Sequence, residues 1–444
     1  MEKQIYFLIA LLLTLGVFGY TTWRYIGFFR LTKPAFKVSD IGRRFGVMLE
    51  VAFGQTKIFR RPVIGLLHAL VFWGFLVILI GSIEMVIDGL AGSERALSFL
   101  GVVYKVIMAS GDIFALIIAI AIVVFLFRRI FLNVKRFSGI EMKHISHLDA
   151  NIALSIILLL MLSLLGMNTY YLLDAAGTGH EIVGVYPVSQ MLAGWLDAGE
   201  ANHLLHELNW WAHILLIFAF ANYLPYSKHF HVFMSVPNVF LSRLEPLGKL
   251  DTMESITREV KIMMDPDQAF ASPPAGEEAE EEVPERFGVL DVEDVNWKNY
   301  LDSLACTECG RCTSVCPANI TGKKLSPRKI VMDVRARMKE KGPQLVKNGA
   351  DFSDNKALIR DYVSEEELWA CTLCNACAQE CPININQPAL IVGMRRYLVM
   401  EESAAPGELN SIFSNIENNG APWQFSQDDR LLWAEDLMIN DKSQ

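Results

Sequence analysis

The sequence has no cysteine outside two short motifs, and it has no stretch rich in lysine and arginine of the kind that binds nucleic acid. Because all eight cysteines fall in these motifs, none is left for a disulfide or for a nucleophilic thiol. Charged residues make up only 20% of the 444 residues and hydrophobic residues 52%, which is too apolar for an ordinary soluble protein. We therefore expect no nucleic-acid partner and no thiol chemistry in this chain, and we expect part of it to lie among membrane lipids.

The two cysteine motifs share one spacing, C-x2-C-x2-C-x3-C-P. Their cysteines are Cys306, Cys309, Cys312 and Cys316 in the first motif and Cys371, Cys374, Cys377 and Cys381 in the second. Two such motifs are typical of proteins that hold a pair of 4Fe–4S clusters, in which the fourth cysteine of each motif binds the other cluster. We therefore predict that Cys381 completes the first motif's cluster and that Cys316 completes the second motif's cluster. Two structural zinc sites are the alternative, but zinc ligands are usually paired C-x2-C units with a longer gap.

Five segments are long and apolar enough to cross about 30 Å of hydrocarbon, which takes roughly 20 helical residues. They lie near residues 5–29, 63–87, 104–131, 150–173 and 209–230. The first is longer than the apolar region of a signal peptide and no small-residue cleavage site follows it, so we expect a retained helix.

Basic residues are distributed unevenly among the loops that join these segments. Residues 30–61 and 128–143 carry many lysines and arginines, whereas residues 174–208 carry none and residues 84–103 carry only Arg95. Because basic loops stay in the cytoplasm, this pattern places the N-terminus outside and the chain after about residue 231 inside. Cluster-binding cysteines also require a reducing compartment. We expect a multi-pass protein of the cytoplasmic membrane.

Four histidines lie within or at the ends of these segments and are candidate cofactor ligands. His68 is near the inner end of the second segment, His213 is near the outer end of the fifth, and His229 and His231 are at its inner end. An imidazole inside a bilayer is costly unless it binds a metal or finds a partner. A b-type haem with two axial histidines needs them at one depth, and a rise of about 1.5 Å per residue matches His68 with His231 or His229. The alternatives are headgroup anchoring for His229 and His231 and a hydrogen-bonded core position for His68.

One carboxylate, Asp112, is expected roughly 12 Å inside the third segment at helical rise. A carboxylate at this depth could accept a proton from a quinol, which makes Asp112 a tentative catalytic residue. It could equally be a neutral, hydrogen-bonded contact between helices.

The second and fifth segments resemble those of the gamma subunit of respiratory nitrate reductase, a five-helix dihaem quinol dehydrogenase. The residues that carry the resemblance are 65–68, His213, Ser227, His231 and 235–237. The resemblance implies that His68 and His231 hold a haem b near the cytoplasmic face. It also implies that His213 binds an outer haem, but Ile78 stands where the partner histidine is expected. His203, His206 or His180 of the outer loop is the alternative partner.

The C-terminal half has three parts. Residues 241–286 combine a helical stretch with an acidic, proline-rich tract that is typical of a disordered linker. Residues 287–400 contain both cysteine motifs and resemble the helical dicluster domain found in the C subunit of heterodisulfide reductase. Residues 401–444 are rich in apolar and turn residues and are expected to pack on this domain or on a partner protein.

Taken together, the chain is similar to the membrane-spanning C subunit of quinone-interacting membrane-bound oxidoreductases and their heterodisulfide reductase-like relatives. The expected fold is an all-α membrane five-helix bundle over residues 1–240, followed by a soluble, mainly α-helical dicluster ferredoxin domain. The resemblance implies an oxidoreductase subunit that links quinone, through one haem b or two and two 4Fe–4S clusters, to a cytoplasmic iron–sulfur or flavin oxidoreductase subunit. Two alternatives remain: a haemless membrane-anchored ferredoxin, and a structural subunit of a redox complex.

Overall fold

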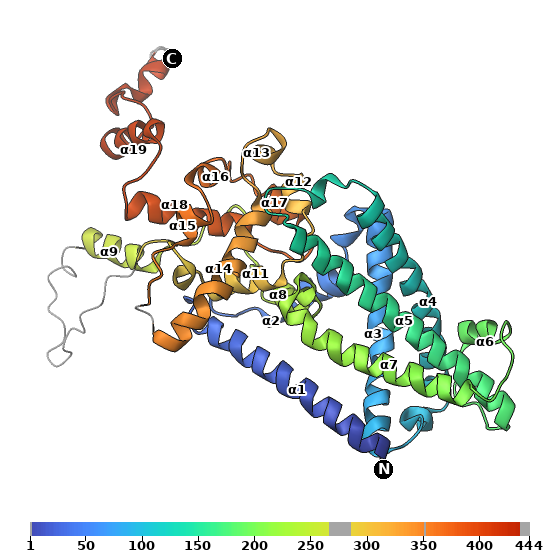
Figure 1. The fold of residues 1–444 in the computed structure, drawn as a ribbon. Coiled ribbons are helices and arrows are strands. Elements are labelled where there is room, and N and C mark those ends of the chain that lie inside the picture. Colours follow the sequence, from blue (N-terminus) through green and yellow to red (C-terminus); the bar gives the residue numbers. More distant parts are fainter. Residues whose placement is uncertain (1, 266–285, 350–351, 436–444) are drawn as a thin grey trace. The chain divides into compact units, whose positions relative to one another are not determined.

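The computed structural model describes residues 2–265, 286–349 and 352–435. Over these residues the chain is built from helices and contains no β-strand (Figure 1). The predicted all-α fold is therefore confirmed. The acidic tract for which we predict disorder lies, apart from its two ends, outside the described residues.

Five long apolar helices form most of the N-terminal half of the chain. They are α1 (Glu2–Phe29), α3 (Pro62–Ala91), α4 (Val102–Phe131), α5 (His144–Thr178) and α7 (Asn202–Tyr223). All five are long and apolar enough to cross a membrane, α7 together with the short turn that follows it. The five predicted segments are thus present as helices, and the helices continue past the apolar runs into the polar ends.

The ends of these helices follow from local sequence. Pro62 begins α3 at a position where its missing N–H costs nothing. Gly92 ends α3 with a left-handed backbone (φ 71°), which a residue with a Cβ adopts only with strain. Arg128 and Arg129 occupy the last turn of α4, where positive charge interacts favourably with the helix dipole.

Within the bundle, α5 packs between α4 and α7, α3 packs on α4, and α1 lies against α3 and α7. One buried apolar cluster joins α4 to α5 and includes Ile118, Ile122 and Leu160. A second joins the start of α1 to α7 through Phe7 and Ile214. The close approach of α1 and α3 depends on Gly89, because a Cβ there would lie 2.6 Å from the Phe7 ring.

Shorter helices connect the long ones and follow α7. They are α2 (Ile41–Val47), η1 (Met48–Phe53), η2 (Ile58–Arg60), η3 (Ala96–Leu100), η4 (Lys135–Phe137), α6 (Pro187–Ala193), η5 (Leu224–Tyr226), η6 (Lys228–Phe230) and α8 (His231–Phe240).

The region that carries the cysteine motifs is a set of short helices around one longer helix. They are η7 (Val292–Asp294), α11 (Trp297–Ala305), α12 (Arg311–Ser314), α13 (Pro317–Ile320), α14 (Pro327–Asn348), α15 (Leu358–Asp361), α16 (Glu365–Trp369), α17 (Ala376–Glu380) and α18 (Gln387–Met400). Side-chain caps define where α11 and α16 begin. Asn296 accepts the Asn299 N–H, and Ser364 forms a reciprocal capping box with Glu367. Because both helices end just before a motif, these caps also position the first cysteine of each motif.

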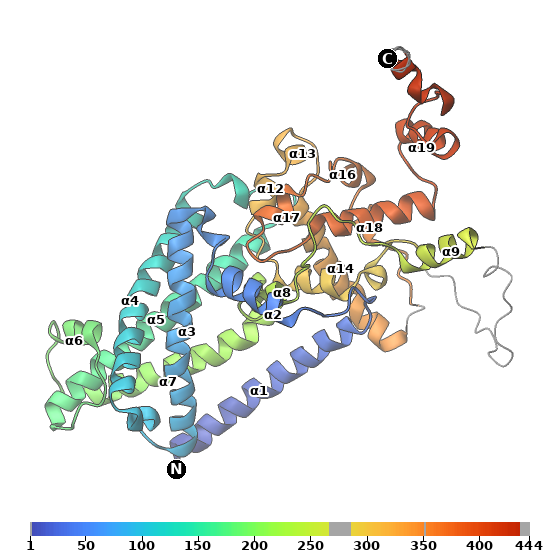
Figure 2. The same ribbon diagram turned by 180° about the vertical axis from the view of Figure 1, so that it is seen from behind.

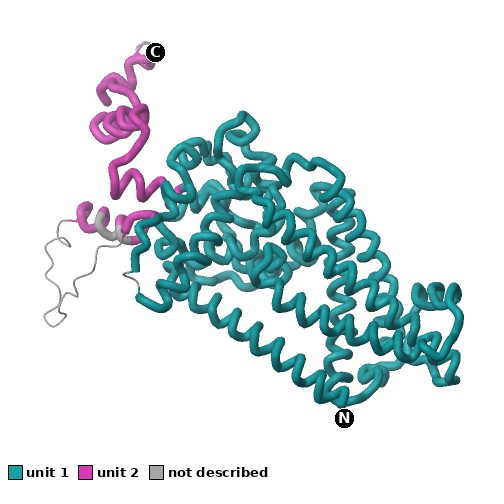
Figure 3. Tube along the Cα trace, viewed as in Figure 1, with its two compact units in different colours: residues 1–251, 291–391 teal, residues 252–290, 392–444 magenta. Residues whose placement is uncertain are grey.

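The chain divides into two compact units (Figure 3). The first unit comprises Met1–Asp251 and Asp291–Ile391, and so it contains the membrane helices together with both cysteine motifs. The second comprises Thr252–Leu290 and Val392–Gln444, with α9 (Glu254–Met264), α19 (Gly407–Asn419) and η8 (Asp428–Ala434). Within the second unit, the Val289 N–H donates to the Gly393 carbonyl at 2.9 Å.

In the first unit, the cysteine-motif region packs on the end of the bundle where α1 ends and α3 begins (Figures 1 and 2). The basic loops of the bundle provide much of this contact. Arg328, with a fully buried side chain, donates to Glu141 and to the carbonyls of Arg136 and Ser138. Arg311 donates to the carbonyls of Lys57 and Ile58 at 2.8 and 3.1 Å. The loops that we predict to be cytoplasmic thus lie on the side of the bundle that carries the cysteines.

Candidate metal centre and adjoining cavity

The two cysteine motifs adopt the same local backbone. In each, the first cysteine follows a helix, the third lies in a short helix, and the fourth directly precedes a proline. Two positions of each motif have a left-handed backbone: Glu308 and Gly310 in the first (φ 58° and 71°), Leu373 and Asn375 in the second (φ 53° and 59°). Left-handed residues turn the chain sharply, so successive thiols face one centre.

The thiols gather in two groups, as shown by the charges that act on them. Burial raises the pKa of the Cys312 thiol well above its usual value, and the thiols of Cys309, Cys306, Cys381 and Cys377 raise it further. Burial likewise raises the pKa of Cys377 to about 12, and its neighbours are Cys371, Cys316 and Cys374. Cys381 therefore lies with the first motif and Cys316 with the second. This grouping is the one expected if the fourth cysteines are exchanged, and the ligand assignment itself stays a prediction.

The donor set fits two cubane clusters. Among the described residues, no three cysteine, histidine, aspartate or glutamate side chains converge on a point that would hold a single metal ion. A cubane does not need such convergence, because each thiolate binds its own iron. Bound iron also holds a thiol in its deprotonated form, which burial alone disfavours here.

The two groups differ in their surroundings. Cys309 of the first motif lines a large cavity that extends into the bundle. Cys374 of the second group is exposed, whereas Cys306, Cys312 and Cys381 of the first group are buried. The first group therefore faces the membrane helices, and the second group reaches the protein surface.

The cavity has a volume of about 570 Å³, within the roughly 300–1,000 Å³ of typical ligand sites. Its walls are mainly apolar side chains of the bundle helices α3, α4, α5 and α7. All four predicted histidines, His68, His213, His229 and His231, line it. One cavity thus joins the imidazoles of the bundle to the first cysteine group.

The hydrogen bonds of the histidines leave ring nitrogens available. The Nδ1 atom of His68 is buried without any hydrogen-bond partner among the described residues, and His68 interacts electrostatically with His231. The Nδ1 atom of His231 lies 3.4 Å from the Lys228 carbonyl, which leaves its Nε2 for a ligand. Burial lowers the pKa of His231 to about 4 and that of His229 to about 3. Both imidazoles are therefore neutral at pH 7, as axial ligands must be.

His213 is placed differently. Its Nδ1 atom lies 2.9 Å from both the Ser163 hydroxyl and the Leu160 carbonyl, so its ring orientation is set by α5. Ile78 lines the same cavity. Of the outer-loop histidines, His206 contacts the Met167 carbonyl and is not among the residues that line the cavity. His180 and His203 are also absent from the residues that line the cavity, so none of the three outer-loop histidines reaches it.

Asp112 is almost fully buried and accepts several hydrogen bonds. The N–H groups of Val188 and Ser189 donate to its Oδ2 atom at 2.7 and 3.0 Å, and the Ser189 hydroxyl and Asn168 donate to Oδ1. Its side chain therefore caps the N-terminus of α6 and links α4 to α5 and α6 through hydrogen bonds. These contacts agree with the structural alternative for Asp112, and its role towards a quinol stays a prediction.

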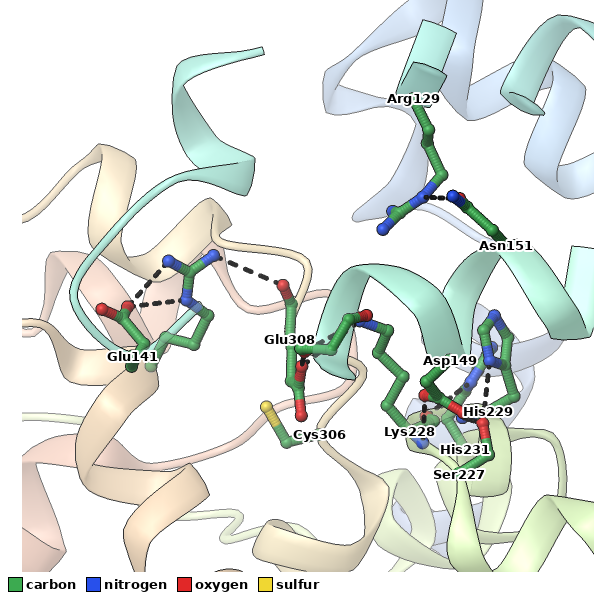
Figure 4. Close-up of polar contacts among 12 residues, drawn as sticks. Arg129, Glu141, Asp149, Asn151, Ser227, Lys228, His229, His231, Cys306 and Glu308 are labelled. Carbon is green, nitrogen blue, oxygen red and sulfur yellow. Dashed lines mark hydrogen bonds and ion pairs between the residues drawn. The ribbon is translucent and has the colours of Figure 1, made fainter. Parts of the chain in front are cut away.

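The sequence did not indicate that buried polar contacts join the loop of the first cysteine motif to the bundle; we call these contacts of Glu308 with Lys228, Arg335 and Ser146 the polar joint. Glu308, between the first two cysteines of its motif, lies 3.3 Å from the Lys228 ammonium and also pairs with Arg335 and Ser146. Figure 4 shows Glu308, Lys228 and Cys306 together at this joint. Lys228 directly precedes His229 in the sequence. The only signal available in the sequence was an acidic residue inside a cluster-binding motif.

Comparison with known proteins supports the reading of the cysteine motifs as iron–sulfur sites. Residues 305–385 match the family model of the 4Fe-4S dicluster domain. The chain is 30% identical over 416 residues to a probable iron-sulfur-binding oxidoreductase, FadF, of Bacillus subtilis, which covers 86% of this chain and 54% of the relative. It is 28% identical over 468 residues to EtfAB:quinone oxidoreductase of Syntrophomonas wolfei, covering 98% of this chain and 60% of the relative.

A probable membrane-anchored ferredoxin of Chromohalobacter salexigens is 35% identical over 165 residues, which is 34% of this chain and 24% of the relative. No solved structure matches the chain. The chain spans a little over half the length of the first two relatives.

Proposed function

We propose that this membrane-anchored iron–sulfur electron-transfer protein, a relative of quinone oxidoreductases and heterodisulfide reductase subunits, links the quinone pool through haem b and two 4Fe–4S clusters to a cytoplasmic redox partner. The observation that carries the proposal is the cavity, which is lined both by His68 and His231 and by Cys309. A cofactor held by these histidines would share its cavity with Cys309 of the first cysteine group.

The cavity fits a b-type haem in three respects. Its walls are apolar, its volume suits a cofactor, and it presents imidazoles that are neutral at pH 7. His68 and His231 would hold the haem iron, with His229 as the alternative to His231. When bound, haem b supplies one-electron transfer, and so it can split the two electrons of a quinol into single steps. His213 is the candidate ligand of a second haem.

The exposure of the cysteines supports an order of electron transfer. Cys309 borders the cavity, so the cluster of the first motif is the one that exchanges electrons with the bundle. Cys374 is exposed, so the cluster of the second motif is the one that a partner protein can approach. Because Cys316 and Cys381 each bind the cluster of the other motif, the two clusters are held close together.

Quinone is the proposed partner on the membrane side. The Syntrophomonas relative is named EtfAB:quinone oxidoreductase. In this chain, Asp112 is the proposed acceptor of a proton from the quinol. The partner on the other side is proposed to be a cytoplasmic iron–sulfur or flavin oxidoreductase subunit. The contact of the basic loops with the cysteine-motif region supports an N-outside, C-inside orientation, because positive loops remain in the cytoplasm.

The direct test is the absorption spectrum of the purified full-length protein, oxidised and reduced. We expect b-type bands that disappear in His68→Ala and His231→Ala, while both iron–sulfur signals in paramagnetic resonance remain. His144→Ala is the matched control, because His144 is exposed at the start of α5 and outside the cavity.

Absence of b-type bands in the wild-type protein would instead identify a haemless membrane-anchored ferredoxin. Loss of the only haem in His213→Ala, with His231→Ala unchanged, would show that the ligand pair is wrong. Clusters that a quinol analogue does not reduce in membranes would favour a structural subunit.

A further inference from the structure

The walls of the cavity carry an excess of positive charge. Five cationic side chains and one carboxylate line it, namely Arg128, Arg129, Arg136, Lys228, Arg311 and Glu308. Two of the cations already have partners within the protein. Lys228 pairs with Glu308 at 3.3 Å, and Arg311 donates to the Lys57 and Ile58 carbonyls. The remaining three arginines, Arg128, Arg129 and Arg136, form what we call the arginine cluster.

The arginine cluster surrounds one aromatic ring. The guanidinium carbons of Arg128, Arg129 and Arg136 lie 5.4, 4.8 and 5.1 Å from the centre of the Phe137 ring. Arg129 donates to the amide oxygen of Asn151 at 3.3 Å, which is a neutral partner. No carboxylate of the described residues lies within ion-pair distance of the three arginines, and those of Asp149 and Glu308 act on Arg129 only from farther away.

Arg136 is the arginine of the cluster that has a buried nitrogen atom without a hydrogen-bond acceptor in the described part of the chain. Its Nε atom is buried and has no hydrogen-bond partner within the described ranges. The like charges of Arg128, Arg61 and Arg311 act on Arg136 as well. Burying like charges without counter-ions is costly, whereas guanidinium groups bind carboxylates through two parallel hydrogen bonds. An anionic group beside the Phe137 ring would pair with the Arg136 Nε–H and lie close to the guanidinium groups of Arg128 and Arg129.

The position of the arginine cluster identifies the chemistry of that group. The same cavity is lined by His68 and His231, and its other walls are apolar. A ligand that fits this cavity has a flat apolar body for the walls, a metal that the imidazoles bind, and carboxylates at one edge for the arginine cluster. We propose that Arg128, Arg129 and Arg136 bind the two carboxylates of the haem, an inference that rests on the function proposed above. The carboxylates of a bound haem would then lie on the side of the cavity that is lined by Arg136 and Cys309.

The experiment compares Arg136→Gln with Arg136→Lys in the full-length protein. Lys135→Gln is the matched control, because Lys135 is an exposed cation one residue away that does not line the cavity. Arg128→Gln is the second variant. Within the described ranges the Arg128 guanidinium forms no hydrogen bond to the protein, so this substitution breaks none. The readouts are haem content, the haem reduction potential, and the redox-induced infrared spectrum of protein that contains haem with ¹³C-labelled carboxylates.

We expect Arg136→Gln to retain its haem, since the imidazole ligands are unchanged. Removing a positive charge next to the carboxylates disfavours the reduced haem, and we expect its reduction equilibrium to fall about tenfold, or about 59 mV for a one-electron couple. The labelled carboxylate bands should shift in Arg136→Gln and Arg128→Gln, should partly recover in Arg136→Lys, and should be unchanged in Lys135→Gln.

Unchanged potentials and unchanged carboxylate bands in both glutamine variants, with haem bound, would overturn the assignment of the arginine cluster alone. Loss of a bound anionic phospholipid in these variants, with the haem signals unaffected, would show that the arginines bind a lipid phosphate and would also overturn it. A wild-type protein without haem would overturn the proposed function as well, so the two failures are distinguishable.

Discussion

Replacing Glu308 with glutamine is expected to weaken the joint between the first cysteine motif and the membrane bundle. The side chain of Glu308 is 7% exposed, that of Lys228 is 6% exposed, and their charged atoms lie 3.3 Å apart. With an effective dielectric constant of about 20, two charges at this distance attract by about 5 kcal/mol. Part of this attraction offsets the cost of burying the charges, and removing one partner of a buried pair typically costs about 3–5 kcal/mol.

The arrangement also predicts an asymmetry between the two partners. Glu308→Gln leaves the Lys228 and Arg335 cations buried without a carboxylate, whereas Lys228→Met leaves Glu308 paired with Arg335. We therefore expect Glu308→Gln to be the more destabilising. The double variant should be less destabilised than the sum of the single variants, because the two residues interact directly.

The measurement is the free energy of unfolding of the detergent-solubilised protein, followed through the absorption of the iron–sulfur clusters during titration with denaturant. The matched control is Glu366→Gln, because Glu366 pairs with Lys324 at 2.6 Å but both side chains are more than half exposed. Exposed pairs contribute about 0–1 kcal/mol. If Glu308→Gln costs no more than Glu366→Gln, the reasoning about a buried joint is refuted.

Three further predictions concern the cysteine motifs and the orientation. Gly310→Asn should destabilise the protein, because a Cβ at Gly310 would lie 2.3 Å from the Arg136 carbonyl, whereas Asn375 occupies the equivalent left-handed position without difficulty and Asn375→Gly should be mild; thermal unfolding of both variants checks this. Cys316→Ser should damage the cluster of the second motif, and selective loss of the first motif's cluster in paramagnetic resonance would contradict the exchanged ligands. A C-terminal reporter should be active only if it works in the cytoplasm, and cleavage of the cysteine-motif region by protease added outside would reverse the orientation.

The histidines show how far depth along a helix can predict a site. Helical rise alone matched His68 with His231, and the structure places both on one cavity, where they interact electrostatically. The same reasoning separated His213 from this pair, yet His213 lines the same cavity. Depth along an axis is a one-dimensional quantity, so it could not show that the space between the helices is continuous.

The sequence by itself determined the features whose parts are neighbours in the chain. Thiols spaced by two residues on one loop must face a shared centre, and an apolar run of about 20 residues has to be buried in hydrocarbon wherever it occurs. For this reason the cysteine motifs and the five apolar helices could be predicted without any knowledge of packing.

Only the tertiary structure decided which distant segments meet. Glu308 and Lys228 are 80 residues apart, and Asp112 caps a helix 76 residues further along the chain. The arginine cluster likewise opens onto the same cavity as His68 and Cys309 only because α3, α4 and the first cysteine motif pack at one end of the bundle. Such contacts depend on the directions in which packed helices and loops leave the core, and neither hydrophobic periodicity nor motif spacing encodes those directions.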